Sequence, residues 1–166
     1  MLWHCLPFEQ LSTAQLYQIV ALREAVFVVE QNCAYLDADG KDPKCYHVWA
    51  DTSITLSMTG LSVTPILAYA RIVKPGVSYP EVSIGRVVTS ADVRRTGLGR
   101  ELMRVTIDCV YDIYGEVPIR ISAQTYLEGF YQSLGFQTVT DGYLEDDIPH
   151  VGMLKRVGKD AYLEEG

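Results

Sequence analysis

The feature that most constrains how this chain can fold is a change of hydrophobic period at Gly97. Residues 81–89 read as a strand of period 2, and from Gly97 onward apolar residues recur every three or four positions, as on one side of a helix. The helical stripe consists of Leu98, Leu102, Val105, Cys109 and Ile113, with Arg100, Glu101, Arg104, Asp108 and Asp112 largely outside it. A strand that passes through a glycine turn into an amphipathic helix predicts a mixed fold of strands and helices.

The remaining segments extend this pattern over the chain. Strands are predicted at residues 2–8, 45–51, about 63–73, 81–89, 119–123, from Phe136, and at 151–155. Helices are predicted from Ser12 or Thr13 to roughly Gln31, buried on more than one side, from Gly97 to the stop at Gly115 and Pro118, and around residues 127–134. The Ser/Thr-rich residues 52–62 connect two strands. No repeat or Pro/Gly/Ser-rich linker divides the chain, so we expect one domain over residues 1–166 with an α/β (α+β) fold.

Composition excludes several classes of function. The chain has 166 residues and a formal net charge of −7, which disfavours nucleic acid as a partner. No run of about 18 apolar residues and no basic amino-terminal segment occurs, so we expect a soluble cytoplasmic protein without a membrane partner. The four cysteines lack disulfide or zinc spacing. Cys33, Cys45 and His47 could be considered as metal ligands, but residues 45–50 alternate like a strand, with Cys45, His47 and Trp49 on one face, and we expect no metal.

A candidate anion site lies where the second predicted helix begins. Gly97 and Gly99 stand there among Arg94, Arg95 and Arg100. Glycines at a helix start let backbone N–H groups and the positive end of the helix dipole approach a phosphate or pyrophosphate. The spacing matches neither a Walker A loop nor a dinucleotide fingerprint, and the alternative is a tight turn with solvated arginines.

Two motifs in sequence order resemble those of the GNAT superfamily, the Gcn-five-related N-acetyltransferases. The first is RxxGxG at residues 94–99, after a strand end at Val87–Thr89, and the second is FYQSLGF at residues 130–136. The chain is similar to the ElaA-like branch also in LREAVFVVEQNCAYLDADGKD, IGRVV and YLEDDIPHVGM. The resemblance implies a mostly antiparallel central sheet, flanked by helices, whose fourth and fifth strands splay apart.

The resemblance also implies roles for individual residues toward acetyl-CoA as cosubstrate. Val87, Val88 and Thr89 would pair through their backbone with the pantetheine arm. The pyrophosphate would be wrapped by Arg94, Arg95, Thr96, Gly97, Leu98, Gly99 and Arg100. Gln124 occupies the place of an Asn that orients the cofactor in many relatives, and Phe130 of the second motif is also expected to bind the cofactor. Tyr131 would be the general acid that protonates the leaving thiolate, against the alternative of a core tyrosine.

The general base stays open at this stage. Some relatives carry a Glu on the strand before the second motif, but that strand reads PIRISA here. Glu81 is the first candidate, and Glu30, Glu145 and His150 are others. Each also has a purely structural interpretation, and a water chain could serve instead.

The acidic loop after the first helix allows two interpretations. Arg23 would be costly to bury without a carboxylate, which Asp37, Asp39 or Asp42 could supply as a structural tie. Alternatively, these residues and Glu145–Asp147 form an acceptor pocket that attracts a cationic amine.

The reaction indicated by the resemblance is transfer of an acetyl group from acetyl-CoA to a primary amine, by direct attack in a ternary complex. We expect the acceptor to be a small-molecule or peptide amine. The sequence allows a homodimer but does not indicate one. Two alternatives are an acyl-homoserine-lactone-synthase-like enzyme and an acyl-CoA-binding module without catalysis.

Overall fold

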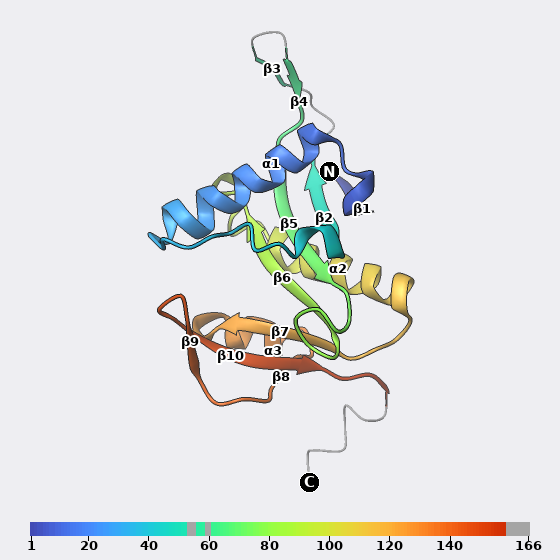
Figure 1. Ribbon diagram of the computed structural model, residues 1–166, viewed down its shortest axis with the longest axis vertical. Coiled ribbons are helices and arrows are strands. Elements are labelled where there is room, and N and C mark those ends of the chain that lie inside the picture. Colours follow the sequence, from blue (N-terminus) through green and yellow to red (C-terminus); the bar gives the residue numbers. More distant parts are fainter. Residues whose placement is uncertain (53–55, 59–60, 159–166) are drawn as a thin grey trace.

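The computed structural model describes residues 1–52, 56–58 and 61–158. Within them, one eight-stranded sheet has the order β1–β2–β5–β6–β7–β10–β8, with β9 also paired to β10, and β3 and β4 form a separate hairpin (Figure 1). The strands are β1 (Leu2–Pro7), β2 (Cys45–Asp51), β3 (Leu56–Met58), β4 (Leu61–Val63), β5 (Ile66–Val73), β6 (Val82–Thr89), β7 (Ile119–Gln124), β8 (Gln137–Thr138), β9 (Tyr143–Glu145) and β10 (Ile148–Lys155). The α-helices are α1 (Thr13–Arg23), α2 (Leu98–Tyr114) and α3 (Glu128–Gln132). The predicted α/β fold is confirmed.

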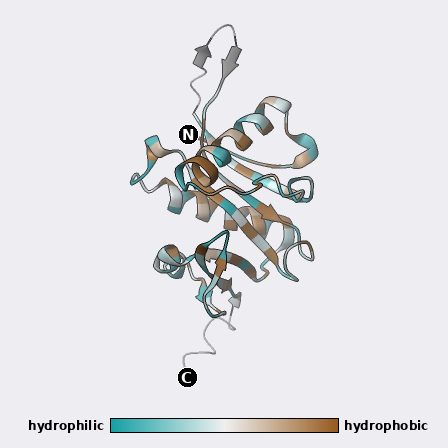
Figure 2. Ribbon diagram, turned by 60° about the vertical axis from the view of Figure 1, so that its left-hand side comes forward, coloured by the Kyte–Doolittle hydropathy of each residue, from teal (hydrophilic) through white to brown (hydrophobic). Residues whose placement is uncertain are grey.

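The two longer helices cover opposite faces of the sheet. On one face, Val48, Ala50, Ala68 and Ala70 pack with Leu102 and Met103 of α2. On the other face, Trp49, Tyr69 and Val88 pack with Ile19 of α1. This alternation along β2 is the predicted one, because successive strand residues point to opposite faces. Figure 2 shows hydrophobic residues concentrated on the central strands.

The first helix begins as predicted but changes its winding. Ser12 caps α1 in a capping box with Gln15. The chain continues as a π-helix, η2 (Glu24–Glu30), in which the N–H of Gln31 donates to the carbonyl of Val26 over 3.0 Å. The expectation of burial on several sides is wrong: only Ile19 and Arg23 of α1 are buried, because a single sheet face covers the helix.

The sheet divides between β6 and β7. These strands run parallel and pair only at Val82 with Ile119 and at Ser83 with Arg120. Every other strand pair in the described residues is antiparallel. Beyond Ser83 the two strands separate, as Figure 1 shows, so the edge of β6 that faces β7 lacks a strand partner. The predicted splay of the fourth and fifth strands is confirmed.

Several element boundaries differ from the predictions. The strand expected at residues 63–73 is split into β4 and β5, with Thr64 and Pro65 between them, and proline has no N–H for a sheet ladder. The hairpin of β9 and β10 was not predicted; it turns through Asp146 and Asp147, both with positive φ. Part of the predicted connector 52–62 lies outside the described residues.

Among the described helices, none has the length and apolar character needed to cross a bilayer.

Candidate active site

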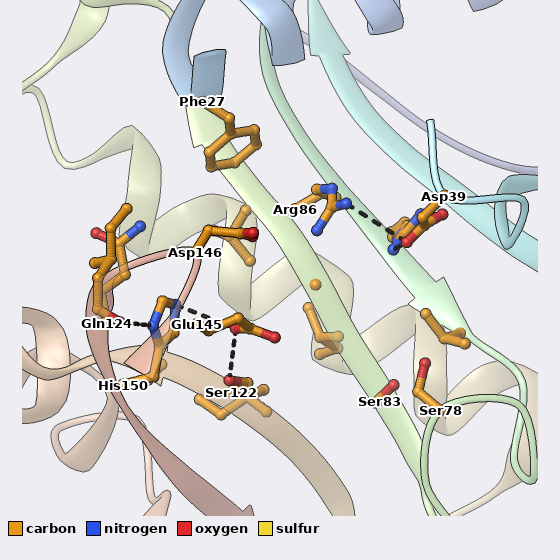
Figure 3. Close-up of a pocket in the computed structure, with 18 of the residues that line it drawn as sticks. Phe27, Asp39, Ser78, Ser83, Arg86, Ser122, Gln124, Glu145, Asp146 and His150 are labelled. Atoms are coloured by element: carbon orange, nitrogen blue, oxygen red, sulfur yellow. Dashed lines mark hydrogen bonds and ion pairs between the residues drawn. The ribbon is translucent and has the colours of Figure 1, made fainter. Parts of the chain in front are cut away.

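The separation of β6 from β7 creates a cavity of about 530 Å³ (Figure 3). Its walls include Val87 on β6, Gln124 on β7, Tyr131 on α3 and Phe27 on η2. Of the residues predicted to bind the cofactor, Val87 and Gln124 line this space. Val88 is buried in the core, so only its backbone is available to a ligand, and the backbone role expected for it stays a prediction.

A β-bulge shapes the β6 wall of the cavity. Gly85 pairs with Arg71 and Val88 with Tyr69, so Arg86 and Val87 together stand opposite Ala70. Arg86 has a φ of 53°, a strained value for a residue with a side chain. The bulge places Arg86 on the cavity wall, as Figure 3 shows.

The glycine loop adopts the backbone expected for anion binding. Arg95 and Gly97 have φ values of 64° and 85°, and Gly97 is the N-cap of α2. Alternating left-handed residues turn successive N–H groups toward one side. The buried side chain of Leu98 anchors the helix start, and a Cβ at Gly99 would meet no heavy atom within 4 Å. Open space and unpaired N–H groups therefore coincide at this terminus.

Two arginines of the loop already have protein partners. Arg94 binds both carboxylate oxygens of Glu30, one through Nη2 over 2.6 Å. The Arg94 guanidinium lowers the pKa of Glu30. The guanidinium of Arg100 lies 5.4 Å from the ring centroid of Phe130. A bound pyrophosphate would have to compete with Glu30 for Arg94.

Tyr131 lies at the cavity and is buried, with Phe130 and Phe136 against its ring. In the part of the chain that the structure describes, the Tyr131 hydroxyl has no hydrogen-bond partner. Burial raises the pKa of Tyr131 to about 12, so the phenol is protonated at neutral pH.

The base candidates from the sequence are separated by the fold. Glu81 forms a two-bond ion pair with Arg120, which lowers the pKa of Glu81, and it is not among the described residues that line the cavity. Glu30 is held by Arg94. Glu145 and His150 both line the cavity, with Glu145 Oε2 3.3 Å from His150 Nε2. The geometry therefore favours Glu145 and His150 over Glu81.

Glu145 and His150 are fixed by further contacts. The Ser122 hydroxyl donates to Glu145 over 3.1 Å, and His150 Nδ1 lies 2.7 Å from the carbonyl of Ile148. Both ring nitrogens of His150 thus face acceptors. Gln124 Nε2 donates to Gln31 over 3.4 Å, which links the end of β7 to the end of η2 across the site.

The acidic loop is neutralised by three arginines. Arg23 donates to Asp37 and Asp42, Arg71 to Asp39 and Asp42, and Arg86 pairs with Asp37 and Asp39; these six residues are called the Arg–Asp network below. The structural tie of Arg23 is confirmed. Three guanidinium charges balance these three carboxylates, so the network itself offers no net negative charge to a cationic amine; the acceptor pocket that includes Glu145–Asp147 stays a prediction. Arg71 and Arg86, 32 and 47 residues from Asp39, were missed because their spacing carries no local signal.

Two of the residues considered as metal ligands, Cys45 and His47, have structural roles instead. Cys45 Sγ donates to the carbonyl of Lys41, and His47 lies between the Tyr69 hydroxyl and the carbonyl of Asp42, at 2.8 and 3.0 Å. Burial lowers the pKa of His47. The described residues contain no cluster of three metal-ligating side chains.

The sheet opens between two parallel strands, and a glycine-rich helix start follows the first of them. This combination is typical of N-acyltransferases that use acyl-CoA. The family model of the acetyltransferase (GNAT) domain matches residues 63–157. Protein ElaA of Escherichia coli is 41% identical over 155 residues, which cover 93% of this chain and 96% of ElaA. The chain belongs to the GNAT acetyltransferase family and is similar to its ElaA members.

Solved structures agree with this assignment. A crystal structure of an acyl-CoA N-acyltransferase from Pseudomonas aeruginosa is 37% identical, with a TM-score of 0.80, over 95% of this chain and 100% of that one. The crystal structure of E. coli ElaA is 38% identical, with a TM-score of 0.79, over 93% of this chain and 99% of that one. The predicted family, fold and enzyme class are confirmed.

Proposed function

We propose that this protein transfers an acetyl group from acetyl-CoA to a primary amine by direct attack in a ternary complex. The observation that carries the proposal is the cavity between β6 and β7, which Tyr131 lines and where its hydroxyl has no hydrogen-bond partner among the described residues. Membership of the GNAT family and the likeness to the P. aeruginosa acyl-CoA N-acyltransferase support the choice of donor. The four free cysteines and the acidic composition support a cytoplasmic location.

The residues proposed to hold acetyl-CoA lie along one path. The pantetheine arm would pair with the free edge of β6 at residues 87–89, where β7 has moved away. The pyrophosphate would lie on the N–H groups of residues 95–100, beside the open face of Gly99. Gln124 and Phe130 would flank the arm, and Arg94 would contact phosphate after release from Glu30.

The chemistry is assigned to two side chains. The acceptor's ammonium group first gives one proton to solvent, and the neutral amine nitrogen then attacks the thioester carbonyl carbon. Its second proton passes to the Glu145 carboxylate, which His150 and Ser122 position. The C–S bond then breaks, and the sulfur takes the proton of Tyr131, giving an amide and a free thiol. Burial keeps Tyr131 protonated and also makes a nearby thiolate more basic.

The test combines binding and turnover. We expect calorimetry to detect acetyl-CoA binding and a thiol assay to detect CoA release with primary amines, with mass spectrometry identifying an N-acetyl amide. Glu145→Gln should lower kcat about 100-fold with little change in KM for acetyl-CoA, as expected for loss of a general base. Glu81→Gln is the matched control, and we expect it to keep normal kcat because Arg120 holds this carboxylate.

Three other results would contradict the proposal. Acetyl-CoA binding without thiol release from any amine would indicate a binding module. A lactone product would indicate the acyl-homoserine-lactone-synthase alternative. A loss of kcat in Glu81→Gln and not in Glu145→Gln would return the base assignment to Glu81.

A further inference from the structure

The cavity presents opposite charges on its two sides, which bears on the acceptor and rests on the proposed function. Figure 3 shows Arg86 and Asp39 on the β5–β6 side, and Glu145, Asp146 and His150 on the β7–β10 side. Both groups line the same space. Because the Arg–Asp network is balanced, the charge of each side depends on the residues outside it.

On the β5–β6 side, the residue outside the network is Lys41. Lys41 lines the cavity, and no carboxylate among the described residues forms an ion pair with its ammonium group. Within the network, the buried Nε–H of Arg71 has no acceptor among the described residues, and Arg86 Nε lies 2.9 Å from Asp37 without hydrogen-bond alignment. This side thus has a net positive charge, which comes from Lys41.

On the β7–β10 side, the carboxylates exceed the cations. Glu145 and Asp146 line the cavity, and His150 is the one basic partner of Glu145 among the described residues. Asp146 is bound through its backbone carbonyl, which accepts from Cys33 Sγ over 3.6 Å, and its carboxylate has no ion pair in the described part of the chain. A cationic amine is stabilised here, next to the proposed proton acceptor.

We propose that the acceptor is an amine that also carries a carboxylate, such as a free amino acid. Its ammonium group would face Asp146 and Glu145, and its carboxylate would face Lys41 with Arg86 beside it. Phe27, Tyr35 and Leu36 also line the cavity and offer apolar surface to the body of such a molecule. A polyamine would bring a second positive charge to Lys41 and Arg86, where it is repelled.

The test compares free amino acids with their amides. Alanine, leucine, phenylalanine, lysine and glutamate are each offered as the free acid and as the α-carboxamide, with acetyl-CoA and the full-length protein. We expect the best free acid to have a KM at least about tenfold below that of its amide, the loss of one charged pair. Lys41→Gln should raise that KM about tenfold and abolish the preference. Lys44→Gln, an exposed lysine three residues away that does not line the cavity, should retain it.

The outcomes separate this inference from the proposed function. Amides used as well as free acids, or a preference that survives Lys41→Gln, would overturn the inference and leave the transferase intact. If no amine is acetylated, calorimetry on the acetyl-CoA-loaded protein decides. Binding of the free acid that is stronger than that of its amide and depends on Lys41 would support the inference while refuting the transferase. Equal or absent binding would overturn both.

Discussion

Tyr131 shows how one residue can meet two demands at once. Its ring packs against Phe130 and Phe136 in the core, and its hydroxyl reaches the cavity with no partner in the described chain. A buried hydroxyl with a protein partner would be expected to contribute about 1 kcal/mol to stability. The absence of such a partner favours a role toward a ligand.

We therefore expect Tyr131→Phe to lower kcat about 100-fold or more and to leave the melting temperature nearly unchanged, because packing is kept and only the proton donor is lost. Turnover normalised to folded protein and a melting curve measure both effects. The rate of the wild-type enzyme should also show no alkaline decline below about pH 10, since the pKa of Tyr131 is raised to about 12.

Tyr126→Phe provides the control, because Tyr126 is 76% exposed in the same segment. Full activity in Tyr131→Phe, or a stability loss without a rate loss, would make Tyr131 a core residue only.

At the scale of elements, the start of α2 has two glycines for two different reasons. Gly97 adopts a φ of 85°, which side chains disfavour. Gly99 has helical geometry and an open face, so a Cβ there is tolerated by the protein alone. Only a ligand on that face requires the absence of a side chain.

Gly99→Ala and Gly99→Asp test whether a ligand occupies the open face of Gly99. We expect both variants to fold, because nothing lies within 4 Å of the added Cβ. The aspartate should abolish acetyl-CoA binding through its charge, whereas the alanine should weaken binding about tenfold or less. Calorimetry measures both affinities, and equal binding by Gly99→Asp and wild type would refute the pyrophosphate site.

At the scale of the whole molecule, the Arg–Asp network joins α1, the following loop, β5 and the β6 bulge. Arg23 is fully buried, and Asp42 contacts both Arg23 and Arg71. Removing one partner of a buried ion pair costs about 3–5 kcal/mol. We expect Asp42→Asn to lose about that much unfolding free energy in urea, whereas Asp108→Asn, an exposed change on α2, should lose less than about 0.5 kcal/mol.

The same network sets the acid limit of stability. Burial opposes ionisation of Asp39 and Asp42, but hydrogen bonds and charge from their arginine partners outweigh it and lower the pKa of both carboxyls. A lowered folded-state pKa adds stability above the unfolded pKa of about 3.9, which is lost as pH falls through the folded value. Urea unfolding between about pH 5 and 2 should show this loss, and a much shallower slope is expected in Asp42→Asn.

Local patterns were sufficient to predict much of this protein. The amphipathic stripe from Leu98 predicts α2, since helical periodicity is a property of neighbouring residues. Strand alternation likewise predicted the opposite faces of Val48 and Trp49. The resemblance of residues 94–99 and 130–136 to GNAT motifs indicated the family, and the comparisons confirmed it.

The sequence by itself therefore determined the periodic elements, the helix start at the glycine loop and the need of Arg23 for an acidic partner. Tertiary structure decided which partners meet. Glu81 forms an ion pair with Arg120, 39 residues away. Arg86 lines the cavity because it lies at a bulge, whose position depends on the register between β6 and β5. Such pairings depend on strand register and burial over long separations, and a local pattern carries no information about either.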